Sequence, residues 1–352
     1  MTKYIVEDGF SKIKKTGIGQ YTIMLENILS DLKLDTIKVN KNLLEKIKNK
    51  TIRRFFYLIW LNSIFLMKLL YINKPITVFF TNFTVPMIKI PNVKYISVIH
   101  DLCPFKYPEC SSKFINEYEK NNIINAIKKS DLVITVSKTI KKELVETFKL
   151  DENKIHVVYN TIPSYFFMAN DNDLILNKYN IESKKYILSV ATLNKRKNIP
   201  LLISAFHEIS KKYQDVKLVL IGGMGSEDKK CIMQDNKNII FTGYIKDEYM
   251  PIFYKNALLY VYPSIYEGFG IPILEAQYSN TPLLCTNIEV FKEIAGNGAK
   301  FCNLDTIDMV DKIQILLKNP TLINELKKEE KLNIRKFFIN SILKQLMGVI
   351  NA

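Results

Sequence analysis

The sequence has few of the residues that mark secreted or metal-binding proteins. Its 352 residues include five cysteines, three histidines and one tryptophan, and only four of its fifty basic residues are arginine. The cysteines are odd in number and scattered, without a CxxC pair or a nearby histidine cluster. This pattern argues against a disulfide framework and against a zinc site. We therefore expect reduced thiols in a cytoplasmic protein.

Long apolar runs are also scarce. The first eight residues contain no apolar signal-peptide core, so we expect no cleaved leader. The best membrane candidate is 53–71, but its apolar part is interrupted by Asn62, Ser63 and Lys68, which disfavours a spanning helix. We expect a long helix packed in the N-terminal domain. The open alternative is an amphipathic segment that lies on the membrane surface.

Acidic residues are outnumbered by basic ones, which gives a formal net charge of +15. Such a charge attracts phosphorylated ligands and acidic membrane surfaces, so peripheral contact with an acidic membrane is a candidate interaction. No recognisable nucleic-acid-binding motif accompanies the charge. We therefore do not expect nucleic acid to be a partner.

Short apolar runs alternate with helical stretches along the chain, the pattern of α/β architecture with parallel sheets. We expect two Rossmann-like domains that face one another across a cleft. The N-terminal domain is expected at 1–165 and the C-terminal domain at 184–335. The polar stretch 166–183, rich in Asn and Asp, is expected to connect them.

The most informative segment is YPSIYEGFGIPILEA, at 262–276. It follows an apolar run of strand length, and Gly268 and Gly270 allow a sharp turn with accessible amides. A proline suited to the first helical turn comes next. A helix N-terminus with free amides binds anions, and a diphosphate is a natural occupant. Glu267 is expected on the loop and Glu275 in the first helical turns.

This segment resembles the E-x7-E signature of the retaining glycosyltransferases of family 4, which have the GT-B fold. The resemblance implies that Glu267 faces the donor sugar and that Glu275 binds the ribose of the nucleotide. It also implies that the turn Gly268-Phe269-Gly270 lies against the diphosphate. In this family the last helix, here 336–350, packs back on the first domain. The alternative is an ordinary strand-to-helix junction with a solvated glutamate.

Two segments of the N-terminal half also resemble this family. Gly17-Ile18-Gly19 precedes a helical run, and the similarity implies a glycine loop beside the donor phosphates or the acceptor. His100 ends an apolar run, where sites form in parallel sheets. The His-Asp segment of the family implies that His100 faces the donor sugar. For Gly17 and Gly19 a plain helix N-terminus is the alternative, and for His100 it is a structural histidine.

Two further segments complete the candidate donor site. Arg196 and Lys197 follow a strand and open a helix, and both side chains can grip phosphate oxygens. They resemble the family's phosphate-binding pair, which would stabilise the charge of the leaving nucleotide. Many members of the family instead place the arginine where Thr192 stands. Tyr244 lies in a segment similar to the base-binding loop, which implies that it covers the base.

The resemblance to this family implies a metal-independent, retaining hexosyltransferase with a nucleotide-diphosphate sugar as co-substrate and no cofactor. The expected acceptor is a glycan or a polyprenyl-diphosphate-linked glycan, in lipopolysaccharide O-antigen or capsule synthesis at the inner face of the cytoplasmic membrane. The D-x-D-like triplet at 171–173 falls in the expected connection and is discounted as a metal motif. The alternatives are a non-catalytic nucleotide-sugar or polyanion-binding protein and a sugar-nucleotide epimerase.

Overall fold

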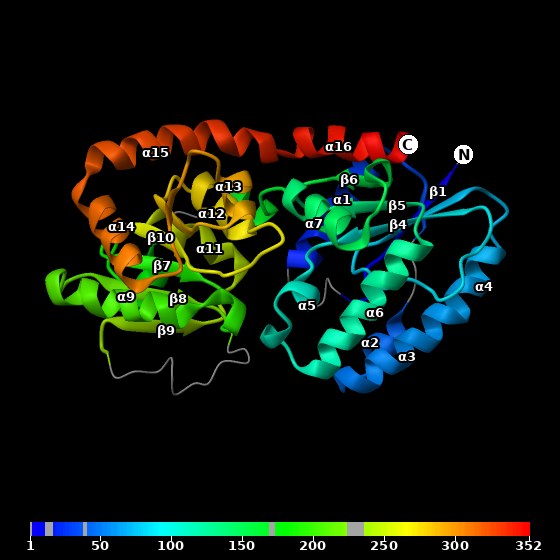
Figure 1. Cartoon of the computed structure of the whole chain (residues 1–352), viewed down its shortest axis with the longest axis horizontal. Coiled ribbons are helices and arrows are strands. Elements are labelled where there is room, and N and C mark those ends of the chain that lie inside the picture. The colour runs from blue at the N-terminus through cyan, green and yellow to red at the C-terminus, as the bar shows by residue number, and fades with distance from the viewer. Residues whose placement is uncertain (1, 11–16, 38–40, 169–172, 224–235) are drawn as a thin grey trace. The chain divides into compact units, whose positions relative to one another are not determined.

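The chain folds into two compact units. The computed structural model describes residues 2–10, 17–37, 41–168, 173–223 and 236–352. Unit 1 comprises Met1–Asn160 and Leu343–Ala352, and unit 2 comprises Thr161–Ile342 (Figure 1).

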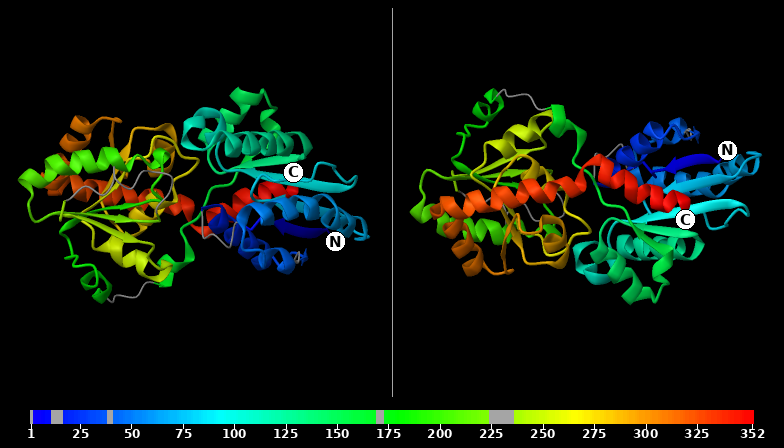
Figure 2. Two further views of the ribbon diagram at one scale, coloured as in Figure 1. Left: turned by 90° about the horizontal axis from the view of Figure 1, so that it is seen from below. Right: turned by 90° about the horizontal axis from the view of Figure 1, so that it is seen from above.

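Unit 1 is built on a parallel six-stranded sheet in the order β2-β1-β3-β4-β5-β6. Every residue of β3 is buried, and so are all but one of β4. Such continuous burial is typical of parallel strands covered on both faces. Figure 2 shows helices on both sides of this sheet. The strands are β1 Lys3–Glu7, β2 Thr36–Ile37, β3 Ile76–Phe80, β4 Val93–Ile99, β5 Leu132–Thr135 and β6 Ile155–Val157.

One or more helices lie between most consecutive strands of unit 1. They are α1 Gly17–Asp31, α2 Asn42–Glu45, α3 Lys50–Asn62, α4 Ile64–Leu70, α5 Cys103–Lys106, η2 Pro108–Cys110, α6 Lys113–Lys129, α7 Lys138–Phe148 and η3 Glu152–Lys154. The end of α16 (Ile339–Asn351) also belongs to unit 1, whereas the helix starts in unit 2.

Unit 2 repeats this design with a second parallel sheet, in the order β12-β11-β10-β7-β8-β9. Its core joins apolar side chains of the sheet to those of α9, α14 and α15. The strands are β7 Tyr186–Val190, β8 Lys217–Ile221, β9 Ile239–Gly243, β10 Leu259–Tyr262, β11 Leu283–Thr286 and β12 Lys300–Cys302. The helices are η4 Ser164–Met168, α8 Leu174–Asn177, η5 Lys195–Lys197, α9 Ile199–Lys212, η6 Asp247–Tyr249, α11 Met250–Lys255, α12 Ile271–Tyr278, α13 Glu289–Ala295, α14 Thr306–Lys318, α15 Pro320–Asn333 and η7 Ile334–Phe337.

The predicted α/β fold with two parallel sheets is confirmed. The sequence did not reveal the three short outer strands β2, β6 and β12, because two or three residues are too few to show a pattern. The long helix expected within 53–71 is two helices, since Ser63 departs from helical backbone at φ −132°. The segment 166–183, which was expected to connect the two domains, belongs to unit 2.

Each sheet contains one point where the strand order reverses. In unit 1 the chain passes from β1 to β2 on one side and then to β3 on the other. In unit 2 it passes from β7 to β8 and β9, and then to β10 on the opposite side. Loops diverge there beyond the carboxyl ends of the strands, and ligands of α/β proteins bind in that opening. The two switch points, β1/β3 and β7/β10, therefore locate the candidate sites.

Candidate active site

The loop after β10 buries the carboxylate of Glu267, which is 6% exposed. Its Oε1 accepts hydrogen bonds from Ser264 Oγ at 2.9 Å and from Tyr262 OH at 3.0 Å. Lys197 Nζ lies 2.5 Å from the same oxygen, and Arg196 Nη1 lies 3.1 Å from Oε2. The structure thus brings together three of the predicted site residues at the β7/β10 switch point.

Arg196 and Lys197 reach this carboxylate from the short helical turn η5, beyond the end of β7. The side chain of Asn194 accepts a hydrogen bond from the backbone N–H of Lys197 at 3.1 Å, which fixes the start of the turn. The carbonyl of Arg196 accepts a hydrogen bond from the N–H of Ile265 at 2.9 Å. Backbone and side-chain bonds therefore join the two loops across the switch point.

The two cations determine the charge state of Glu267. Burial alone raises its pKa, but the charges of Arg196 and Lys197, with hydrogen bonds from Lys197 and Ser264, lower the pKa of Glu267 to about 2. The carboxylate is therefore ionised at neutral pH. Two cations and one carboxylate leave this cluster with a formal charge of +1, which favours a nearby anion.

Glu275 lies on α12 with both carboxylate oxygens bonded to tyrosines, and it is 5% exposed. Tyr165 OH donates to Oε1 at 3.0 Å and Tyr254 OH donates to Oε2 at 2.7 Å. Burial raises the pKa of Glu275 to about 7, although these two hydrogen bonds oppose the shift. Sequence reasoning missed both tyrosines, because Tyr165 stands at the end of the expected N-terminal domain and Tyr254 in a helix without a motif.

The glycine turn before α12 has the expected form. Gly270 adopts φ +100°, and a Cβ there would lie 3.1 Å from the Phe291 ring and 3.2 Å from Ile273 Cδ1. Only glycine adopts this backbone readily. Gly268 lies in a bend, and the buried Phe269 packs edge-on against Phe337 with ring centroids 5.8 Å apart. The turn therefore leads directly from Glu267 to the helix that carries Glu275.

Tyr244 follows β9 and is 60% exposed. Its hydroxyl donates to Asp247 Oδ1 at 2.9 Å. The charge of Asp247 also contributes to the raised pKa of Glu275 and of Tyr165. Asp247 therefore interacts with both Tyr244 and Glu275 in unit 2. This is what we expect if Tyr244 and Glu275 contact the same ligand.

His100 lies in unit 1, directly after β4. Its Nε2 is 2.7 Å from the carbonyl oxygen of Thr81, and its ring meets that of Tyr21 edge-on at 5.3 Å between centroids. A carbonyl can only accept, so Nε2 carries the proton of the neutral ring. Burial lowers the pKa of His100, although the Thr81 bond and the charge of Asp101 oppose the shift. The neutral form is therefore favoured near pH 7.

Gly17 and Gly19 also lie in unit 1, in the first turn of α1. Both glycines are helical in the described part of α1, as in the alternative of a plain helix N-terminus, and their place beside a phosphate or the acceptor stays a prediction. Gly17 is exposed and Gly19 is buried. Thr22, on the same helix, lies 2.7 Å from Thr81 between the two hydroxyl oxygens, which fixes α1 to the end of β3.

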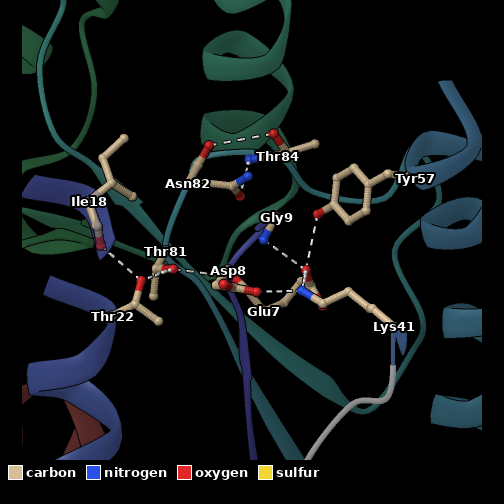
Figure 3. Close-up of polar contacts among 10 residues, drawn as sticks. All are labelled: Glu7, Asp8, Gly9, Ile18, Thr22, Lys41, Tyr57, Thr81, Asn82 and Thr84. Carbon is tan, nitrogen blue, oxygen red and sulfur yellow. Dashed lines mark hydrogen bonds and ion pairs between the residues drawn. The ribbon is translucent and has the colours of Figure 1, made fainter. Parts of the chain in front are cut away.

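The β1/β3 switch point holds a second carboxylate cluster, which the sequence analysis did not identify (Figure 3). Glu7 Oε1 accepts hydrogen bonds from Lys41 Nζ at 2.8 Å, Gly9 N at 2.9 Å and Tyr57 OH at 3.2 Å. Lys41 also pairs with Asp8. Burial alone lowers the pKa of Lys41, but the charges of Glu7 and Asp8 raise it overall. In the sequence, this cluster is indicated only by the acidic pair Glu7-Asp8 at the end of the first strand.

The predicted site residues are thus divided between the units. Gly17, Gly19 and His100 belong to unit 1. The remaining eight belong to unit 2, namely Arg196, Lys197, Tyr244, Glu267, Gly268, Phe269, Gly270 and Glu275.

Metal binding was not expected at the D-x-D-like triplet. Asp171 and Asn172 lie outside the described residues, and Asp173 accepts a hydrogen bond from Asn256 Nδ2 at 3.0 Å. Within the described parts of the chain, no group of three or more His, Cys, Asp or Glu side chains is placed to hold a metal ion. Metal independence stays a prediction.

Comparisons with known proteins point to glycosyltransferases for both halves of the chain. The family model "Glycosyl transferases group 1" matches residues 171–334, and "Glycosyltransferase Family 4" matches residues 42–164. The O-antigen chain mannosyltransferase RfbU of Salmonella typhimurium is 32% identical over 231 residues, which cover 64% of this chain and 60% of the relative. The O-antigen chain mannosyltransferase B of Escherichia coli is 28% identical over 226 residues, which cover 61% of this chain and 58% of the relative. The chain thus spans about 60% of the length of these two relatives.

A solved structure supports the fold. Sucrose-phosphate synthase from Thermosynechococcus elongatus matches with a TM-score of 0.76, and the match covers 100% of this chain and 98% of that chain. The two sequences are 16% identical. At that level the likeness concerns the fold alone.

Proposed function

The chain belongs to glycosyltransferase family 4, and from that premise we propose that it transfers a hexosyl group from a nucleotide-diphosphate sugar to a glycan or a polyprenyl-diphosphate-linked glycan. We propose that the transfer retains the configuration at the anomeric carbon. The two O-antigen relatives suggest mannose as the first sugar to test and a bacterial surface polysaccharide as the product.

The observation that carries this proposal is the ionised carboxylate of Glu267 between two cations. It lies at the β7/β10 switch point, where α/β proteins bind nucleotides. Arg196 and Lys197 exceed it by one positive charge, so a diphosphate placed beside them would be stabilised. As the glycosidic bond breaks, negative charge grows on the leaving phosphate, and fixed cations lower the energy of that state.

The resemblance to family 4 implies the roles of the other residues. The turn Gly268-Phe269-Gly270 would lie against the diphosphate at the start of α12, Glu275 would accept hydrogen bonds from ribose, and Tyr244 would cover the base. Glu267 and His100 would orient the donor sugar. In an oxocarbenium-like transition state, the departing phosphate would take the proton of the attacking acceptor hydroxyl on the same face.

We propose that this reaction needs no metal, because Arg196 and Lys197 can balance the charge of the leaving group. We also propose the cytoplasmic face of the membrane as its location. A non-catalytic nucleotide-sugar-binding protein is the alternative. The ionised carboxylate of Glu267 beside Arg196 and Lys197 favours an enzyme over a binding protein. A site that only binds a diphosphate needs cations but no buried carboxylate next to them.

The first test is a thermal-shift screen with UDP-, GDP-, dTDP- and ADP-sugars. A ligand at 100 times its Kd stabilises the folded state by about 2.7 kcal/mol. We expect one nucleotide family to raise the Tm, and Lys197→Ala and Glu275→Ala to abolish the rise. Lys195→Ala is the matched control, because Lys195 is an exposed cation of the same turn.

The stabilising donor should then be incubated with a lipid-linked glycan acceptor. Sugar transfer with retained configuration supports the proposal. Donor binding without transfer favours the non-catalytic alternative, and epimerised donor favours an epimerase. A folded protein that no nucleotide sugar stabilises contradicts the donor site.

A further inference from the structure

The outer surface of α3 and α4 exposes a stripe of large apolar side chains. On α3, Ile52, Phe55, Phe56 and Ile59 are each 46% to 60% exposed. Their spacing of i, i+3, i+4 and i+7 places them on one face of the helix. The stripe is completed on and around α4 by Ile64, Met67, Leu70 and Tyr71, which are each 45% to 88% exposed. Surfaces of this kind mark interaction sites.

A loop adds two more apolar side chains at the junction of these helices. Met87 and Ile88 are 73% and 66% exposed. The N–H of Met87 donates to Asn62 Oδ1 at 2.7 Å, which holds the loop at the end of α3. We call these ten side chains, from Ile52 to Tyr71 together with Met87 and Ile88, the α3–α4 face.

Cations predominate in the segment that forms this face, although Lys89 is paired with Asp131. The sequence from Lys46 to His100 contains no Asp or Glu but contains nine Lys or Arg, namely Lys46, Lys48, Lys50, Arg53, Arg54, Lys68, Lys74, Lys89 and Lys94. Lys68, between Met67 and Leu70, is exposed, and so is Lys74 just beyond the stripe. Apolar side chains flanked by cations suit a surface that offers both acyl chains and anionic headgroups.

The inner surface of α3 shows that the helix is fixed to unit 1. Tyr57, Trp60 and Leu61 are at most 7% exposed. Tyr57 OH donates to Glu7 Oε1 at 3.2 Å, so α3 is attached to the β1/β3 switch point (Figure 3). The Arg54 guanidinium also lies 3.7 Å from the centre of the Tyr118 ring on α6. The apolar stripe therefore lies on a helix that is well anchored on its other side.

We propose that the α3–α4 face docks unit 1 on an acidic lipid bilayer. Phe55, Phe56 and their apolar neighbours enter the headgroup region, while the cations contact anionic lipids. No described helix is both long and apolar enough to cross a bilayer. This proposal rests on the proposed function, in which the acceptor can be linked to a lipid. It names the surface of unit 1 that meets the membrane.

The charge pattern argues against a second copy of the chain as the occupant. In a symmetric dimer the same patch appears on both partners. Two α3–α4 faces in contact would bring Lys68 and its neighbouring cations close to a second set of cations, and the segment from Lys46 to His100 itself supplies no carboxylate. An anionic lipid surface supplies the missing charge.

The test is co-sedimentation of the full chain with vesicles of phosphatidylcholine alone or with 30% phosphatidylglycerol. We expect binding to the anionic vesicles, weakened by high salt, and a loss of at least tenfold in Phe55→Ser/Phe56→Ser. The matched control is Leu304→Ser/Ile307→Ser in unit 2, which also replaces two exposed apolar residues, 50% and 72% exposed. This control should bind like the unchanged chain.

A readout of folding and site integrity separates docking from the proposed activity. The nucleotide-induced Tm shift should be the same in Phe55→Ser/Phe56→Ser and in the unchanged chain. The docking proposal is overturned if the unchanged chain ignores anionic vesicles or if the double variant binds them equally well. It is also overturned if the double substitution turns a dimer into a monomer in solution. None of these results affects the donor site, which fails only if nucleotide sugars do not bind.

Discussion

The two switch points contain similar groups with opposite net charge. Among the described residues of unit 1, Lys41 lies between the carboxylates of Glu7 and Asp8, and these three side chains have a formal charge of −1. In unit 2, two cations enclose Glu267, which gives +1. A diphosphate would be repelled by the first cluster and attracted by the second. The comparison teaches that the surplus of charge, rather than the presence of an ion pair, identifies the anion site.

The clusters also differ in exposure. The side chain of Lys41 is 7% exposed and that of Glu7 is fully buried, whereas the side chains of Lys197 and Arg196 are 13% and 21% exposed. The two cations of unit 2 are thus more accessible than Lys41, whereas the Glu267 side chain, at 7%, is as buried as that of Lys41. We therefore interpret the cluster of unit 1 as structural, since it joins β1 to Tyr57 on α3, and that of unit 2 as functional. The following predictions test this distinction.

Lys41→Met should have the largest effect on stability. Removing one partner of a buried ion pair costs about 3–5 kcal/mol, because the remaining charges stay buried. We expect the free energy of unfolding to fall by that amount in urea titrations. Lys195→Met, at an exposed lysine, should change it little. The structural interpretation is contradicted if Lys41→Met keeps full stability but loses donor binding.

Glu267→Gln should chiefly affect the reaction. Without the carboxylate, the sugar loses its contact, and we expect kcat for transfer to fall by about 100- to 1,000-fold. Binding of a nucleoside diphosphate should persist or tighten, because the local charge rises from +1 to +2. Isothermal titration calorimetry and a transfer assay measure the two effects. Equal losses of binding and of transfer would show that the carboxylate acts only in folding.

The pH dependence of stability should have opposite signs at the two glutamates of unit 2. The pKa of Glu275 is raised to about 7, so the folded state holds a proton that the unfolded state releases. The wild type should therefore lose about 3 kcal/mol relative to Glu275→Gln as pH rises from about 4.5 to 7. Urea titrations across this range provide the measurement, and parallel curves would contradict the raised pKa.

Glu267 should behave in the reverse way. Its pKa is lowered to about 2, so its contribution to stability is complete above the ordinary carboxyl range and is lost as pH falls towards 2. Glu267→Gln should remove that acid dependence from the unfolding curves. An unchanged acid limb in this variant would show that Arg196 and Lys197 do not stabilise the charged form.

Gly270→Ala should have the smallest effect, a loss of about 1–2 kcal/mol in the free energy of unfolding, because an L-residue is strained at positive φ. Its Cβ would also lie only 3.1 Å from the Phe291 ring. Gly348→Ala on α16 is the control, since a Cβ there meets nothing within 4 Å. That substitution should instead stabilise the helix by about 0.5–1 kcal/mol. Equal changes in the two variants would show that the turn before α12 is not strained.

Local patterns in the sequence were enough to locate most elements around the candidate site. Alternating apolar runs predicted β7 and α12 at their observed bounds, because strand and helix periods are local properties. The segment 262–276 predicted the turn, the loop position of Glu267 and the helical position of Glu275. Ser63 was recognised as a polar interruption, but its departure from helical backbone was not, since that depends on packing around it.

The sequence by itself determined the α/β class, the turn that Gly270 makes possible and the set of charged residues near the strand ends. Only the tertiary structure decided which of these charges meet. Arg196 and Glu267 are 71 positions apart, and Glu7 and Lys41 are 34 apart, so neither pair has a local signature. Tyr165 likewise reaches Glu275 across 110 positions, from the end of the expected N-terminal domain. The physical reason is that electrostatic free energy depends on distance and burial in space, which the order of strands in each sheet sets and the local sequence does not.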